Sequence, residues 1–96
     1  MRKVTTKSSA KTGRIFVAKP SESTLKREVN NARAELAEVL LSLRDKHDLS
    51  QDALALLAGV DRKTINRIEN GHYSPSIDTL VRLSSALSVT PSSLLK

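Results

Sequence analysis

The chain contains no cysteine, and its 96 residues include one phenylalanine, one tyrosine and no tryptophan. The lack of cysteine excludes disulfides and thiolate metal sites. With so few aromatic side chains, the core must be built from leucine, valine, isoleucine and alanine. The histidines, His47 and His72, are expected at helix ends or in loops, without the set of carboxylates that a metal or general-base site needs. We therefore expect no metal and no cofactor.

Long apolar runs are also missing, and none approaches the roughly 20 residues of a membrane-spanning helix. The basic N-terminus is not followed by the apolar stretch of a signal peptide. No nucleophile–base pair, no paired carboxylates in an apolar setting and no glycine-rich phosphate loop is visible. The sequence predicts one small domain in a cytoplasmic protein that is not an enzyme and does not bind membranes.

Acidic residues are missing from the first 21 positions, where six cations occur: Arg2, Lys3, Lys7, Lys11, Arg14 and Lys19. From Ser21 onward ten basic residues balance ten acidic ones, so the net charge of +6 belongs to the N-terminal segment. A cationic segment on a neutral body suits a polyanion partner, and a solubilising tail is the alternative. We predict a flexible, disordered basic arm over residues 1–22 and a folded domain over 23–96. Within the arm, residues 14–18 form a short β-prone run that could pair with a partner.

The remaining sequence predicts an all-α bundle of five helices. Apolar residues recur every three or four positions from Leu25 to Leu43, which favours one helix over about 24–46 or two helices separated at Asn30-Asn31. Capping and stop residues place further helices at about 50–58, 62–70, 75–87 and 91–95. The side chains expected to face inward from the second and fourth of these five helices are Leu54, Leu57, Ala58, Ile77, Leu80, Val81, Leu83, Ala86 and Leu87, with Ser84 interrupting the last stripe.

Residues 50–70 have the pattern of a helix-turn-helix, the geometry that fits the major groove of DNA. Ala55 and Ala58 are small where the two helices cross, and Gly59 allows a positive φ in the turn. Val60, Ile65 and Ile68 form the buried stripe of the second helix. Its outer face carries Arg62, Lys63, Asn66 and Arg67, whose side chains are suited to reading base edges. Gln51 is placed to donate to a phosphate and to brace those side chains. Alone, such a polar face is usually ordinary solvated surface, so the prediction depends on the whole combination.

The residues that identify a family are Leu43-Arg44, Leu49-Ser50-Gln51, Leu54-Ala55, Ala58-Gly59-Val60, Thr64 to Gly71, Pro75-Ser76, Thr79-Leu80 and Ala86-Leu87. With them, the sequence from about Ala32 to Leu95 resembles the lambda-repressor/Cro-like (xenobiotic-response-element) helix-turn-helix family. The resemblance implies a five-helix DNA-binding domain that acts as a homodimer on palindromic operators. By position, it implies base reading by Arg62, Lys63 and Arg67, and an ion pair between Arg44 and Glu69. It implies phosphate contacts by Gln51, Thr64, Asn70, His72, Tyr73 and Ser74.

Three features depart from that family. Leu56 stands where a polar residue is usual, Ser88 replaces the usual glycine, and the first 30 residues have no counterpart. The leading hypothesis is a sequence-specific regulator of transcription, a repressor that binds double-stranded DNA as a homodimer. The alternative is an antitoxin, which binds a toxin protein through residues 14–31 and Leu56 and regulates its own operon. A controller of a phage or restriction system is a third interpretation that the sequence does not separate from the first.

Overall fold

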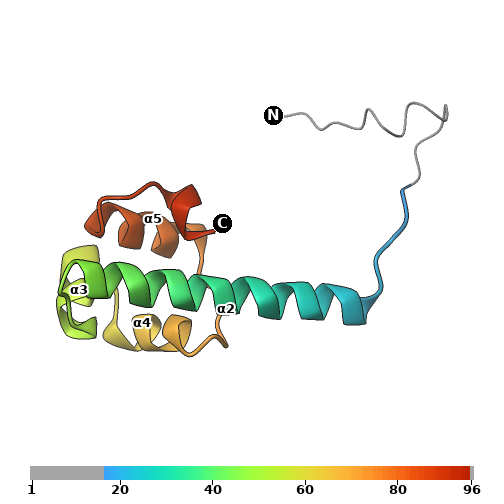
Figure 1. Ribbon diagram of the computed structural model, residues 1–96, viewed down its shortest axis with the longest axis horizontal. Coiled ribbons are helices and arrows are strands. Elements are labelled where there is room, and N and C mark those ends of the chain that lie inside the picture. The colour runs from blue at the N-terminus through green and yellow to red at the C-terminus, as the bar shows by residue number, and fades with distance from the viewer. Residues whose placement is uncertain (1–16, 96) are drawn as a thin grey trace.

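The computed structural model describes residues 17–95, and within them four α-helices and one 3₁₀ turn pack as a bundle without strands (Figure 1). The elements are α2 (Glu22–Lys46), α3 (Gln51–Ala58), α4 (Arg62–Glu69), α5 (Ile77–Ala86) and η1 (Pro91–Leu94). Residues 17–21 have no regular secondary structure. The rest of the predicted arm, with most of the β-prone run, lies outside the described residues. No helix in the described part is both long and apolar enough to cross a membrane.

The first helix is continuous over 25 residues, so the alternative of a break at Asn30-Asn31 is wrong. Ser21 caps it by accepting a hydrogen bond from the Thr24 amide at 3.1 Å. Asparagine costs a helix less than about 0.7 kcal/mol, too little to interrupt a run of good helix formers. The C-terminal half of α2 packs against α4 and η1. Its N-terminal half, residues 22–35, extends beyond the other helices and is called the outer half of α2 below (Figure 1).

Local sequence signals set the ends of the shorter helices. The hydroxyl of Ser50 accepts from the Ala53 amide at 3.0 Å, and the carboxylate of Asp61 accepts from the Lys63 amide at 2.9 Å. Gly59 ends α3 with a φ of +70°, a conformation that favours glycine because it has no Cβ. The amides of Gly59 and Val60 both donate to the Ala55 carbonyl. This turn sets the direction in which α4 leaves α3.

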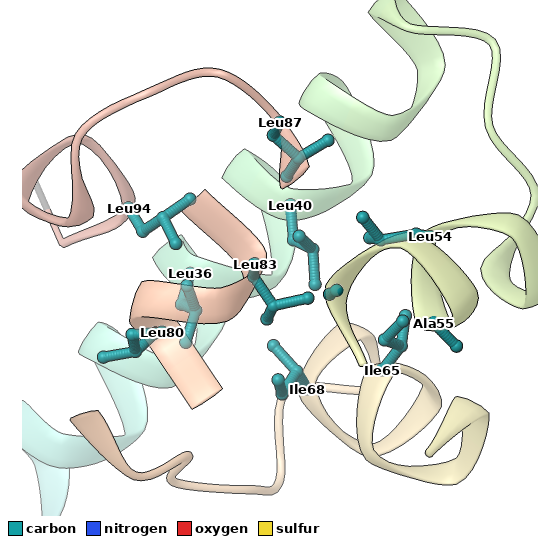
Figure 2. Close-up of a cluster of buried hydrophobic side chains, with 11 residues drawn as sticks. Leu36, Leu40, Leu54, Ala55, Ile65, Ile68, Leu80, Leu83, Leu87 and Leu94 are labelled. Atoms are coloured by element: carbon teal, nitrogen blue, oxygen red, sulfur yellow. The ribbon is translucent and has the colours of Figure 1, made fainter. Parts of the chain in front are cut away.

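The core lies where all the helices meet (Figure 2). It consists of Leu36, Leu40, Leu54, Ala55, Ala58, Ile65, Ile68, Leu80, Leu83, Leu87 and Leu94. Every one of these side chains is aliphatic, as the composition required. Each fully buried leucine or isoleucine contributes about 1.5–3 kcal/mol of transfer free energy relative to its exposed state. The two helices of the motif are therefore fixed by contacts with α2 and α5 as well as with each other.

The predicted fifth α-helix is wrong, because residues 91–94 form a single 3₁₀ turn. Pro91 occupies its first position, and the Ser93 amide donates to the Thr90 carbonyl at 3.0 Å, three residues back. The Leu95 amide makes the same kind of bond to the Ser92 carbonyl, and 3₁₀ segments rarely run beyond three or four residues. The turn still buries Leu94, which closes one end of the core.

Three side chains that were expected to face inward are exposed. Leu57 is 62% exposed, Ile77 72% and Val81 44%. The buried face of α3 is narrow and consists of Leu54, Ala55 and Ala58, and Leu57 lies beside it. On α5 the buried face includes Ser84, whose hydroxyl donates to the Val81 carbonyl at 3.0 Å. Ser84 therefore does not interrupt the buried stripe, because its polar group is satisfied within its own helix.

Two of the unusual positions have structural consequences. Leu56 is 83% exposed, as expected for a position where the family usually has a polar residue. Ser88 has a φ of +59°. This left-handed conformation is strained for a residue with a Cβ, which explains why glycine would suit the turn better.

Candidate nucleic-acid interface

The outward face of α4 is polar and its inward face is apolar. Ile65 and Ile68 are 0% and 1% exposed. The four predicted base-reading residues, Arg62, Lys63, Asn66 and Arg67, are all exposed. Successive residues of a helix are turned by about 100°, which places these four within one side of α4, opposite the isoleucines. Figure 1 shows α4 at the edge of the bundle, and the exposure of these four residues places this side in contact with solvent.

A network of charged hydrogen bonds connects α4 to α2 and α3. Arg44 of α2 donates from Nε to Oε2 of Glu69 at 2.7 Å and from Nη2 to Oε1 at 2.9 Å. Gln51, the first residue of α3, donates from Nε2 to Oε1 of the same carboxylate at 2.8 Å. The third Arg44 contact goes from Nη1 to the Leu49 carbonyl at 2.8 Å. The predicted ion-pair partners are thus brought together, and Leu49 is a partner that the sequence did not indicate.

This network is largely shielded from water. The Glu69 side chain is 5% exposed and the Arg44 side chain 19%. The hydrogen bond from Glu69 raises the pKa of the Arg44 guanidinium above its ordinary value, although burial acts in the opposite direction. Arg44 is therefore charged at any pH near neutrality, and Glu69 always faces a cation. A paired and hydrogen-bonded charge of this kind fixes the orientation of the helices that carry it.

Gln51 lies between the network and the outer face of α4. Besides its bond to Glu69, its Nε2 lies 3.4 Å from Oδ1 of Asn66, one of the predicted base-reading residues. The predicted bracing role matches this position. Its predicted phosphate contact stays a prediction.

Arg62 makes one ion pair with a neighbouring helix. Its Nε lies 3.4 Å from Oδ1 of Asp52, and the two side chains are 60% and 81% exposed. Exposed pairs contribute only about 0–1 kcal/mol. Arg62 can therefore exchange Asp52 for another acceptor at little cost.

The loop after α4 carries most of the predicted backbone-contacting residues. Asn70 is the C-cap of α4, and His72 and Ser74 are exposed. Tyr73 packs its half-buried ring against the core, while Thr64 is half-buried on α4 itself. Gly71, between Asn70 and His72, turns the chain with a φ of +76°. The loop residues thus follow the C-terminal end of α4, whereas Thr64 lies in its first turn.

Sequence reasoning missed Arg33, which ties this loop to α2. Its Nε donates to the Ser74 hydroxyl at 2.9 Å, across 41 residues of sequence. One signal was available, because Arg33 precedes Arg44 by eleven residues, about three turns, and so lies on nearly the same side of α2. Among the described residues, no group of three or more histidine, aspartate or glutamate side chains is arranged to hold a metal ion.

A helix-turn-helix family profile matches residues 40–94, more than half of the chain. The chain belongs to the helix-turn-helix family. Its lambda-repressor/Cro-like type is one of DNA-binding transcriptional regulators rather than of enzymes. The predicted family membership is thus confirmed.

Several helix-turn-helix proteins are similar to this chain. An uncharacterised regulator of Haemophilus influenzae is 36% identical over 61 residues, which are 64% of this chain and 62% of that protein. A solved regulator from Vibrio cholerae shares 35% identity with a TM-score of 0.65, over 69% of this chain and 37% of the other. The chain thus spans less than two thirds of the length of either relative.

Two further structures extend the likeness. The restriction-modification controller C.AhdI from Aeromonas hydrophila is 32% identical, with a TM-score of 0.62 over 65% of this chain and 94% of its own. A hypothetical transcription factor, NHTF, from Neisseria has a TM-score of 0.66 at 24% identity over 86% of this chain and 87% of its own. The Neisseria likeness concerns the fold alone. It covers more of the chain than the family profile does, and so takes in part of α2 upstream of residue 40.

Proposed function

We propose that this protein is a sequence-specific regulator of transcription that inserts α4 into the major groove of double-stranded DNA. The observation that supports this most is the exposed polar face of α4, held in place by the Arg44–Glu69–Gln51 network. A rigidly supported helix is what base reading needs, because a shift of about 1 Å breaks the bidentate hydrogen bonds that distinguish one base pair from another.

The side chains on α4 fit the chemistry of base edges. Arg62, Lys63 and Arg67 can donate to O6 and N7 of guanine, and Asn66 can pair with N6 and N7 of adenine. The surrounding donors are proposed to hold the DNA backbone, which sets the register without reading sequence. These are Gln51, Thr64, Asn70, His72, Tyr73 and Ser74.

We propose a homodimer on a palindromic operator, with repression following from occupancy of a promoter. In support, Ile77 and Val81 are 72% and 44% exposed and lie one turn apart on the same side of α5. A patch of this kind is suited to a second copy of the chain, because a two-fold interface places the same surface of both copies in contact.

The dimer can be tested with two matched substitutions. Val81→Glu should shift the protein to monomers in analytical ultracentrifugation. Leu41→Glu, at a side chain that is 42% exposed on α2, should leave the dimer intact. Equal sedimentation of both variants and the wild type as dimers would place the interface elsewhere.

The DNA-binding function is tested by selection from a randomised duplex library with the full chain. We expect enrichment of one sequence with two-fold symmetry, and protection of that sequence in a footprint. Recovery of unrelated duplexes after repeated rounds would contradict a sequence-specific function.

A second candidate function, that of an antitoxin, is favoured by the exposure of Leu56 and Leu57. These adjacent side chains of α3 are 83% and 62% exposed, which suits a protein partner. If a small reading frame lies next to this gene, its product should arrest growth when expressed alone, and co-expression of this chain should restore growth. Leu56→Asp should then abolish the rescue without abolishing DNA binding. A neighbouring product that causes no growth arrest would remove this candidate.

A further inference from the structure

One side of the outer half of α2 is in line with the face by which the rest of α2 contacts α4. Lys26 and Arg44 are 18 residues apart, about five full turns, so they share one side of the helix. Arg44 is paired with Glu69 of α4. Lys26 therefore points to the same side of the molecule as α4, although it lies well beyond the end of that helix.

Arg33 connects this side to the loop after α4. It stands seven residues, about two turns, from Lys26, and its Nε donates to Ser74 at 2.9 Å. Its Nη1 lies 3.4 Å from Oδ1 of Asn30. Lys26, Asn30 and Arg33 line one shallow hollow along α2. They form a strip that is continuous with the loop in which backbone contacts are proposed, and we name it the α2 strip.

The charges on the outer half of α2 are divided between its two sides. The α2 strip carries two cations and an amide, whereas Glu28 and Glu35 lie on the other side of the helix, more than about 130° away. Glu22, about one turn beyond Lys26, is the acid at the outer end of the strip. The only sizeable apolar side chains beside the strip are Leu25 and Val29, which are 36% and 44% exposed among the described residues.

We propose that the α2 strip is a second contact surface for the phosphate backbone of duplex DNA, beyond the helix-turn-helix itself. This inference rests on the proposed DNA-binding function. Lys26 and Arg33 are separated by about 10 Å along the helix, while duplex DNA carries one charge per roughly 1.7 Å of its axis. The two side chains can therefore neutralise separate phosphates. Arg33 has five N–H donors, and Ser74 and Asn30 use two of them, so others can reach a phosphate.

The test compares two neighbouring residues of the full-length chain. Lys26→Ala removes a cation from the α2 strip, whereas Arg27→Ala removes one from a side of α2 turned about 100° away. Both residues are exposed in the second turn of α2, where alanine is well tolerated. The probes are the duplex recovered by the selection described above and a random-sequence duplex of the same length. Affinity is measured at several salt concentrations, and circular dichroism checks that each variant is folded.

Each phosphate contact contributes about 0.9 to the slope of log affinity against log salt. Lys26→Ala should reduce that slope by about 0.9 per protomer on both probes, and Arg27→Ala should leave it unchanged. Arg33→Ala should reduce it by the same amount, while Arg33→Lys, which keeps the cation, should restore it. Equal slopes for Lys26→Ala and Arg27→Ala would overturn the inference, because a general effect of net charge acts on both.

The outcomes also separate this inference from the proposed function. If the wild type binds its selected duplex and only the difference between Lys26→Ala and Arg27→Ala is absent, the α2 strip does not contact DNA and the proposed function stands. If the wild type binds neither duplex, the proposed function is wrong, and the inference is wrong with it.

Discussion

Arg44 and Glu69 form a two-point contact in which Nε and Nη2 of the guanidinium donate to the two carboxylate oxygens at 2.7 and 2.9 Å. The contact joins the first described helix to the C-terminal turn of α4. Removal of either partner leaves the other as a charge in a mostly buried position. The orientation of α4 therefore depends on a pair of residues that do not belong to its exposed polar face.

Glu69→Ala should lower the free energy of unfolding by about 3–5 kcal/mol, since it leaves Arg44 without its counter-charge. The double variant with Arg44→Ala should recover part of that loss in chemical denaturation. The exposed pair of Asp78 and Arg82 is the control, because its Nε–Oδ1 distance is also 2.7 Å. Its coupling energy should be below about 1 kcal/mol. Strictly additive effects of Arg44→Ala and Glu69→Ala would argue against the contact.

Arg62→Ala and Arg67→Ala should relax sequence preference. A bidentate contact from arginine to guanine contributes about 1–3 kcal/mol of discrimination against the wrong base. Affinity for the selected duplex should fall while affinity for random duplex changes little, as measured by fluorescence anisotropy. Equal losses on the two duplexes would show that these side chains touch only the backbone.

Ser88→Gly should stabilise the protein by roughly 0.5–1 kcal/mol. Relief of the left-handed conformation contributes about 1–2 kcal/mol, and the greater freedom of glycine in the unfolded chain offsets about 0.4–1 kcal/mol of it. Ser85→Gly is the matched control, because Ser85 is exposed and lies within α5. That change should destabilise the protein by up to about 0.5 kcal/mol, because serine is a better helix former than glycine. Thermal denaturation that shows the same sign for both substitutions would contradict this account of the turn.

Deletion of residues 1–20 should flatten the salt dependence of DNA binding. The segment carries six cations, and if half of them contact phosphates the slope should fall by about two to three units per protomer. Preference among operator variants should be retained, because base reading is assigned to α4. An unchanged slope would exclude the segment from the DNA interface and favour a protein partner for residues 14–18.

The parts of the fold that the sequence predicts correctly are those governed by local chemistry. Ser50 and Asp61 cap the helices because their side chains satisfy amides two or three residues away, and Gly59 ends α3 because its backbone adopts a positive φ. These helix ends depend only on residues that are close together in the sequence. The prediction that Leu57 and Ile77 lie in the core is wrong. The apolar pattern of a helix does not show which part of a broad apolar face packs against another helix.

The same distinction applies to the candidate site. The polar face of α4 follows from helical periodicity, whereas the pairing of Arg44 with Glu69 was expected only from a family resemblance. The bond from Arg33 to Ser74 spans 41 residues and depends on how far α2 extends past α4. No local pattern encodes that distance. The roles of the α4 side chains toward DNA stay predictions that the substitutions above can test.

The unbroken course of α2 makes its outer half, 14 residues at about 1.5 Å each, a rigid spacer about 21 Å long. The start of α2 at Glu22 is therefore held at a fixed distance and in a fixed direction relative to the bundle. That direction depends on the number of residues in the helix, because each residue turns the chain by about 100°. Removal of seven residues from the outer half, about two turns, would shorten the spacer and keep the direction, whereas removal of two would turn the preceding segment to roughly the opposite side.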